Sequence, residues 1–107
     1  MKTAPSFFEQ VYRLVECVPP GYVTTYGALA KALNTKDARR VGHALHANPD
    51  AEKTPCHRVV FTNGKLVPGY AFGGPKEQLR KLQLEGVVFL DDNTVDLTQS
   101  FFSFPSK

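Results

Sequence analysis

The residues best suited to chemistry are Cys56 and His57, which stand side by side after Pro55 and before an apolar run at residues 59–61. A thiolate is a strong nucleophile, and an imidazole that takes its proton lowers the effective pKa of a thiol from the free value of about 8.5. Because adjacent side chains on an extended segment point to opposite faces, we expect a water-mediated link between the thiol and the imidazole. Glu85, in the last turn of a predicted helix, is the candidate to hold the imidazole. The pair therefore predicts a cysteine nucleophile with a histidine base.

The Cys56–His57 pair has two other interpretations on the residues alone. As structural residues they would be a buried thiol and a hydrogen-bonded histidine. As metal ligands they would join His43 and His46, but this spacing beside an adjacent cysteine and histidine is not a familiar zinc pattern. We expect neither a metal nor a cofactor.

Cys17 differs from Cys56 because no histidine lies near it in the sequence. We expect a small, buried, inert residue within a helix. A Cys17–Cys56 disulfide is the alternative, which a reducing compartment disfavours. No secretory signal is visible and no segment approaches a membrane span, so we expect a cytoplasmic protein with no membrane partner.

The length of 107 residues predicts one domain over residues 1–107, with a modest core. Lys and Arg outnumber Asp and Glu by 13 to 10, which fits a weak preference for polyanions without establishing one. In the first half of the chain, a helix over residues 7–18 follows a capping box formed by Ser6 and Glu9. Thr25 is placed to cap a second, short helix that ends near residue 33.

Residues 34–35 supply a turn and a cap for a third helix over residues 36–46, and such a pair of short helices favours a helix-turn-helix. The third helix is expected to bury Ala38, Val41 and Leu45. Its outer face carries four basic side chains, which indicate either a DNA-binding face or an ordinary solvated surface: Arg39, Arg40, His43 and His46. Gly42, in the helix interior, indicates that DNA or a neighbouring helix approaches the backbone closely.

A hairpin is predicted after the Cys-His pair, with strands at residues 58–61 and 65–67 and a tight turn at residues 63–64. A helix follows from residue 75 to Gly86, with Leu79, Leu82 and Leu84 facing inward. Two short strands (87–90 and 94–97) precede an aromatic tail that we expect to fold back onto the domain. The predicted fold class is mainly α with a small β wing, a winged helix-turn-helix DNA-binding domain.

Residues 55–60, Pro-Cys-His-Arg-Val-Val, resemble the active-site motif of the O6-alkylguanine-DNA alkyltransferases, which remove alkyl groups from damaged guanine. Matched motifs follow the same order at residues 21–27, 38–42, 48–49, 69–70 and 84–86, so the resemblance covers about residues 7–90. It implies a helix-turn-helix docked in the minor groove of double-stranded DNA and a damaged nucleotide rotated out of the duplex. It also implies a single, irreversible transfer of the alkyl group to Cys56, by a protein expected to be a monomer.

The resemblance carries individual roles over to this chain. Arg39 resembles the finger that fills the vacated stack, and Tyr26 resembles the residue that crowds the phosphate 3′ to the lesion and protonates the departing guanine. The other expected DNA contacts are Thr25, Arg40, Gly42 and Val59.

At the reaction centre, the resemblance implies that Cys56 is the alkyl acceptor, His57 its water-mediated base and Glu85 the partner of that base. Asn48 resembles the asparagine that ties the recognition helix to the active-site loop. The backbone carbonyls of Cys56 and Val59 would read the exocyclic amine of guanine.

Several features depart from the family pattern. The usual member carries an N-terminal companion domain, and none is expected here. The bulk of Arg40 and His43 could hinder a helix in a minor groove, the turn between the two helices is one residue shorter, and the loop at residues 70–74 is one residue longer.

The length and the tail after residue 84 resemble the alkyltransferase-like proteins instead. These proteins bind O6-alkylguanine without repairing it and hand the lesion to nucleotide excision repair, and they typically carry tryptophan where this chain has Cys56. The alternative function is therefore lesion binding with an idle Cys56. A more distant alternative is an ordinary winged-helix regulator.

Overall fold

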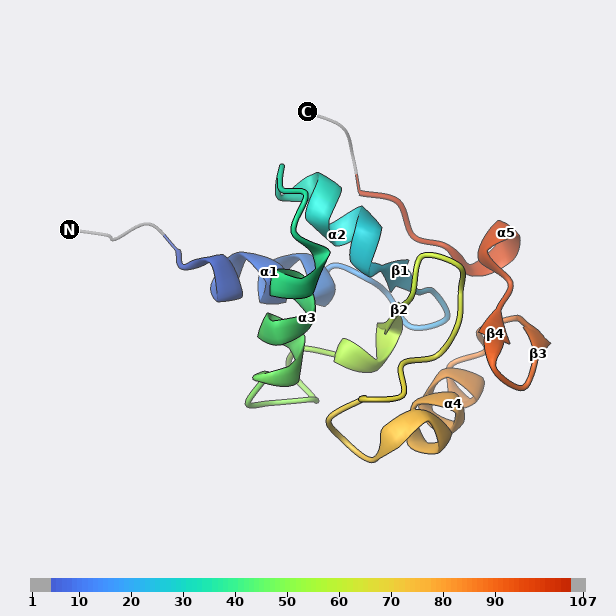
Figure 1. The fold of residues 1–107 in the computed structure, drawn as a ribbon. Helices are drawn as coiled ribbons and strands as arrows, with labels where there is room; N and C mark the ends of the chain where they lie inside the picture. Colours follow the sequence, from blue (N-terminus) through green and yellow to red (C-terminus); the bar gives the residue numbers. More distant parts are fainter. Residues whose placement is uncertain (1–4, 105–107) are drawn as a thin grey trace.

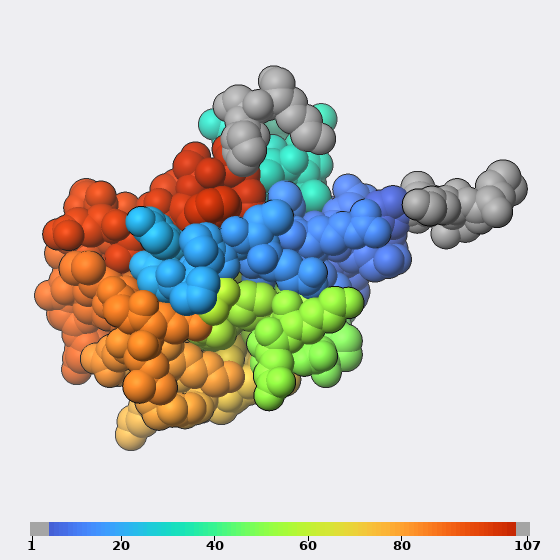
Figure 2. Space-filling model, turned by 180° about the vertical axis from the view of Figure 1, so that it is seen from behind, coloured from blue at the N-terminus to red at the C-terminus, as the bar shows by residue number. Residues whose placement is uncertain are grey.

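In the first half of the chain, the first and second helices each pack against the third, and the fourth helix lies on the other side of the molecule (Figure 1). The computed structural model describes residues 5–104. The elements follow in the order α1 (Phe7–Glu16), β1 (Thr24–Thr25), α2 (Tyr26–Ala32), α3 (Ala38–His46), the 3-10 turn η1 (Cys56–Arg58), β2 (Val59–Val60), α4 (Gly74–Leu84), β3 (Phe89–Asp91), β4 (Thr94–Val95) and α5 (Leu97–Ser100). Seen from behind, α1 crosses the middle of the molecule, with the C-terminal segment on one side and the segment leading to η1 on the other (Figure 2). Within residues 5–104, no helix is long and apolar enough to cross a membrane.

The helix α1 begins as predicted. Ser6 Oγ accepts from Glu9 N at 3.1 Å, and Ser6 N donates to Glu9 Oε1 at 3.2 Å, so both members of the capping box are satisfied. Val11 and Val15, one turn apart, are fully buried against the rest of the helical layer. This helix forms the support on which α3 packs.

The N-terminal cap of α2 is the predicted one, whereas the cap of α3 differs from the prediction. Thr25 Oγ1 accepts from Ala28 N at 3.0 Å, which confirms the first. The second helix begins at Ala38, and Asp37 Oδ1 caps it by accepting from Arg40 N at 3.1 Å, so the predicted cap at residues 34–35 is wrong. Ala38 is exposed, contrary to its predicted inward position, because it opens the helix at its rim. The buried face consists of Val41, Ala44 and Leu45.

The predicted hairpin at residues 58–67 is wrong in its pairing. β2 lies parallel to β1, with Thr24 opposite Val59 and Thr25 opposite Val60. The predicted turn at residues 63–64 does form, with Gly64 N donating to Phe61 O at 2.7 Å and Phe61 N donating to Lys65 O at 3.0 Å. Beyond this turn, residues 65–67 form no strand with β2, because Lys65 bridges to Thr94 and Leu66 N donates to Asn93 O at 3.0 Å in the C-terminal hairpin. Gly64 makes this possible, since its φ is +88° and a Cβ there would lie 2.7 Å from Val95 O.

In the last third of the chain, α4 packs against the C-terminal hairpin through an apolar cluster that includes Leu82, Val87 and Val95. Leu82 is buried as predicted, but Leu84 is 74% exposed, so its predicted inward position is wrong. Gly86 follows the helix at φ +85°, the left-handed conformation that ends helices. The second predicted strand ends early, because α5 begins at Leu97. The tail folds back as expected, with Phe102 N donating to Val23 O at 2.8 Å.

Two groups of buried apolar side chains form the core. The first joins α1, α2 and α3 and includes Cys56, Val59 and Tyr70. The second surrounds Val60 and Leu82, between α4 and the C-terminal hairpin. The segment from Cys56 to Val60 therefore runs along the junction of the two groups, and both halves of the molecule position it.

Candidate active site and nucleic-acid interface

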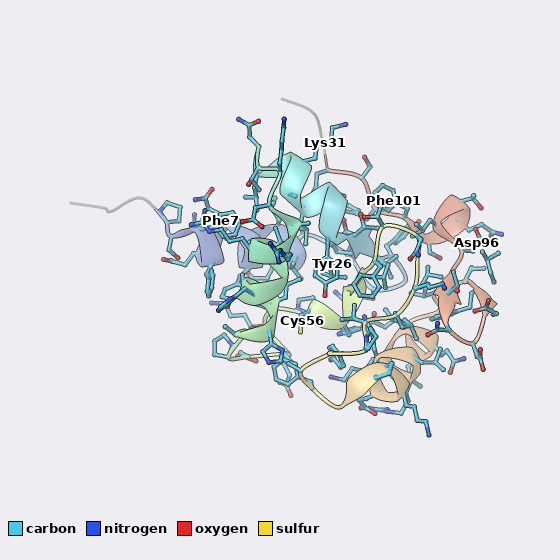
Figure 3. All side chains as sticks on the ribbon, in the orientation of Figure 1. Phe7, Tyr26, Lys31, Cys56, Asp96 and Phe101 are labelled. Carbon is cyan, nitrogen blue, oxygen red and sulfur yellow. The ribbon has the colours of Figure 1, made fainter. Side chains whose placement is uncertain are left out.

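Cys56 begins the turn η1 and is not on an extended segment, so the predicted local geometry is wrong. Its side chain is only 5% exposed, and the thiol is free. In Figure 3 its sulfur lies below the Tyr26 ring, in the region between α3 and the loop that leads to α4. A turn lets the residue face this region while the preceding segment stays packed against α1.

His57 and Glu85 come together as predicted. His57 Nε2 lies 3.0 Å from Glu85 Oε2, and because a carboxylate only accepts, Nε2 carries the proton. His57 Nδ1 is buried and has no hydrogen-bond partner among the described residues. In the neutral ring this nitrogen holds the free lone pair, so it is the atom that can accept a proton.

Arg58 is the residue that holds Glu85, and sequence reasoning gave it no role. Its Nε donates to Glu85 Oε1 at 3.0 Å and its terminal nitrogen to Oε2 at 2.6 Å, in a two-pronged ion pair. A third bond joins the guanidinium to Val18 O at 2.8 Å. The only available signal was the place of Arg58 within the motif at residues 55–60.

Burial decides the direction of the pKa shift at Cys56 and His57, but not at Glu85. It raises the pKa of the Cys56 thiol above its ordinary value, and Asn48 and the charge of Lys81 offset this only in part. Burial lowers the pKa of His57 despite the opposing effect of Glu85, so the imidazole is neutral. Burial acts to raise the pKa of Glu85, but hydrogen bonds from Arg58 and His57 outweigh it and keep the carboxyl ionised.

Asn48 ties the end of α3 to the segment before the active turn. Its Nδ2 donates to Thr54 O at 2.8 Å, and its Oδ1 accepts from Asp50 N at 3.1 Å. The side chain is buried, and its bond to Thr54 is shielded from water. The structure thus gives Asn48 the connecting position that the sequence predicted.

A cavity of about 120 Å³ borders Cys56. It is lined by Tyr26, Gly42, Leu45, His46, Cys56, Val59, Val67, Gly69, Tyr70 and Ala71. Burial, with a smaller contribution from the charge of Cys56, raises the pKa of Tyr26 to about 12, so its hydroxyl keeps its proton. A thiol, a protonated phenol and several apolar side chains therefore line one hollow.

A wider groove of about 670 Å³ shares Tyr26, Gly42 and His46 with this cavity. Its remaining lining consists of Ala38, Arg39, His43, Phe61 and Thr62. No salt bridge in residues 5–104 involves Arg39, so its positive charge lines the groove without a carboxylate partner. Phe61, which sequence reasoning missed, is exposed and packs against Tyr26, with ring centroids 5.6 Å apart and ring planes tilted by 40°.

The predicted DNA contacts divide into two groups. Arg39 and Gly42 line the groove, and a Cβ on Gly42 would meet only Tyr26 Cε1, at an ordinary 3.7 Å. Because this contact with the first residue of α2 is an ordinary one, helix packing among the described residues does not require a glycine here.

The other contacts are held elsewhere. Arg40 lies with its guanidinium 4.0 Å above the Phe7 ring, beside the groove. Thr25 is buried, with its hydroxyl used as the cap of α2. Val59 lines the cavity, and its carbonyl already accepts a bond from Gln78.

Tyr70 and Lys81 are further residues that the sequence reasoning missed. Lys81 Nζ donates to the Tyr70 hydroxyl at 2.8 Å, which fixes the tyrosine against the cavity. Among the described residues, no three His, Cys, Asp or Glu side chains come close enough together to hold a metal ion.

Residues 6–87 match the family model described as the DNA binding domain of 6-O-methylguanine DNA methyltransferase. The chain belongs to this family. It is 37% identical over 100 residues to a DNA base-flipping protein of Escherichia coli, covering 91% of this chain and 74% of that protein. It is 44% identical over 88 residues to a methylated-DNA–protein-cysteine methyltransferase of Methanosarcina acetivorans, covering 78% of this chain and 56% of that protein.

A solved structure of a family relative has the same arrangement of elements. S. pombe Atl1, in complex with damaged DNA containing O6-carboxymethylguanine, matches with a TM-score of 0.76 at 27% identity, over 91% of this chain and 94% of Atl1. The chain spans 35% to 56% of the length of two methyltransferase relatives that it matches.

Proposed function

We propose that this domain binds O6-alkylguanine in double-stranded DNA and transfers the alkyl group, once, to Cys56. The observation that carries the proposal is the shared lining of two hollows. The small cavity at Cys56 and the groove along the basic face of α3 have Tyr26, Gly42 and His46 in common. A guanine turned out of a duplex on the groove would therefore enter at the sulfur.

The DNA-binding part of the proposal has α2 and α3 acting as a helix-turn-helix, with α3 in the minor groove. Arg39 fills the gap left by the rotated nucleotide, and the basic residues of α3 neutralise phosphates. The glycine at position 42 leaves room for the DNA backbone. Arg40, folded onto Phe7, contacts the strand from the side, which removes the steric objection to its bulk.

In the transfer step, the Cys56 sulfur attacks the alkyl carbon and the bond between that carbon and O6 breaks. The thiol proton passes through water to His57 Nδ1, while Glu85 stabilises the imidazolium that forms. The departing guanine takes a proton from the Tyr26 hydroxyl, and the proton held by His57 passes through water to the resulting tyrosinate, so that both residues end neutral. The thioether is stable, so no step restores the thiol and one chain repairs one lesion.

The second candidate is lesion binding without transfer, with the lesion passed to excision repair proteins. Burial of Cys56 and its raised pKa favour this candidate, because the thiol is protonated before DNA arrives. The likeness to Atl1 over 94% of that protein's length also supports it.

One experiment separates these candidates. The protein is incubated with duplex DNA carrying one O6-methylguanine, its intact mass is measured, and its affinity is compared with that for the undamaged duplex. A gain of one methyl group supports transfer, and preferential binding without a mass gain supports the lesion binder. Equal affinity for both duplexes and no mass gain would contradict both and leave an ordinary winged-helix regulator.

A further inference from the structure

Gln78 lies within α4 and is fully buried, although its side chain is a polar amide. Nε2 donates to His57 O at 3.1 Å and to Val59 O at 3.0 Å, and Oε1 accepts from Val67 N at 2.8 Å. All three partners are backbone atoms. One side chain therefore joins the active turn, the strand β2 and the loop that leads to α4.

The segments that Gln78 joins are the walls of the Cys56 cavity. Cys56 and Val59 line it from the active turn and β2, and Val67 and Tyr70 line it from the loop. These walls cannot separate at Gln78 without leaving buried backbone groups unpaired, which is costly. Because the cavity is only about 120 Å³, a small change in the separation of its walls changes what reaches the sulfur.

Glu85, seven residues further along the chain, holds the same turn at a second point. Residues seven apart in a helix lie on one face, separated by about 10 Å. Glu85 binds the side chains of His57 and Arg58, and these bonds orient the groups proposed for proton transfer. Gln78 binds only backbone, which concerns the shape of the cavity.

We propose that Gln78 is a positioning residue that fixes the separation between the Cys56 turn and the Val67–Tyr70 wall. It thereby sets the largest group that reaches the Cys56 sulfur. The inference rests on the proposed function only where it takes the group that reaches the sulfur to be the O6 substituent of guanine. The physical claim holds for any electrophile.

The test measures how Cys56 discriminates by size. Alkylation rates are measured with iodoacetamide and with the bulkier N-benzyl iodoacetamide, and peptide masses separate Cys56 from Cys17. The wild-type protein should favour the small reagent, and Gln78→Met should reduce this preference at least about fivefold, the factor expected for a single hydrogen bond, since it removes three. Gln78→Asn, equally polar but too short to reach all three partners, should show the same loss and serves if the methionine variant does not fold.

Leu82→Val is the matched control, since Leu82 is fully buried on the same helix and makes no polar contact with the cavity. It should change both alkylation rates in proportion and leave their ratio intact. An unchanged ratio in folded Gln78 variants, or an equal shift in Leu82→Val, would overturn the inference.

Duplexes carrying O6-methylguanine or O6-benzylguanine then separate this inference from the proposed function. Suppose that the Gln78 variants lose the size preference toward the reagents, while the wild-type protein neither repairs nor preferentially binds either duplex. This result supports the role of Gln78 and contradicts the proposed function. If the wild-type protein repairs or preferentially binds both duplexes but the Gln78 variants keep the wild-type size preference, the proposed function is supported and the role of Gln78 is contradicted.

Discussion

Cys17 and Cys56 lie in opposite surroundings within one chain. Cys17 follows α1, is exposed, and donates only a weak bond from its thiol to Arg13 O at 3.3 Å. Cys56 is almost fully buried, next to a histidine that is in turn held by an ionised carboxylate. The predicted burial of Cys17 is therefore wrong, and the cysteine predicted to react is the one less accessible to solvent.

The comparison shows that exposure and directed reactivity are separate properties. An exposed thiol meets any reagent in solution, but no neighbouring base or acid favours one reaction. Cys56 is shielded from water, and its partners would act only on a substrate that enters the cavity. Each variant described next tests one part of this contrast.

Replacing the buried thiol should have the largest effect. Cys56→Ala should abolish alkyl transfer and retain binding of an O6-methylguanine duplex, because the cavity and the basic groove remain. Cys17→Ser should transfer at the wild-type rate. Intact mass and fluorescence anisotropy measure the two properties, and transfer that persists in Cys56→Ala would contradict the assignment of the acceptor.

Removing the charge behind His57 should have the next largest effect. Glu85→Gln should slow transfer by about 10²-fold, the lower range for general acid–base catalysis, because the imidazolium loses its stabilising carboxylate. The rate of Cys17 alkylation by iodoacetamide in the same molecule should stay constant. Glu77→Gln, on the exposed part of the same helix, is the control, and equal rates in both variants would contradict the role of Glu85.

Replacing Arg39 should weaken the binding that brings a lesion to Cys56 and leave the reactivity of Cys17 unchanged. Arg39→Ala should weaken binding of the lesion duplex about thirtyfold, the size of a strong interface contact of about 2 kcal/mol. Arg80→Ala removes an arginine that is already paired with Glu77 and should change affinity little. Similar affinities for the two variants in a titration would count against an inserted arginine.

The smallest expected effect comes from adding one methyl group. Gly42→Ala should leave the fold intact or raise the free energy of unfolding by about 0.5–1 kcal/mol, since alanine favours a helix and its methyl group would make only an ordinary contact, 3.7 Å from Tyr26 Cε1. It should nevertheless weaken lesion binding about fivefold, because the methyl group occupies the path between groove and cavity. Thermal unfolding and titration report both, and unchanged affinity would show that DNA does not approach here.

The parts of the site that the sequence predicted are those fixed by local pattern. The Cys-His pair, the cap at Thr25 and the place of Glu85 after a helix follow from neighbouring residues or matched motifs. Gln78 was missed because its three partners are backbone atoms of segments 11 to 21 residues away. A polar residue one turn before the buried Leu82 was its only sequence signal.

The wing was predicted wrongly for a related reason. A tight turn and two short apolar runs favour a hairpin, but the pairing of β1 with β2 and the contact of Gly64 with Val95 join segments 31 to 35 residues apart. Local propensity carries no information about such partners. The predicted burial of Ala38 and Leu84 was wrong for a similar reason, since helical spacing does not show where a helix extends beyond the edge of the core.

The most direct test of the account is the stoichiometry and location of transfer. The protein is incubated with a severalfold excess of O6-methylguanine duplex, the repaired guanine is counted, and the modified peptide is identified. The account predicts a plateau at one repaired lesion per chain, with the methyl group on Cys56 and none on Cys17. A lesion that is bound but never demethylated, or a methyl group on any other residue, would contradict it.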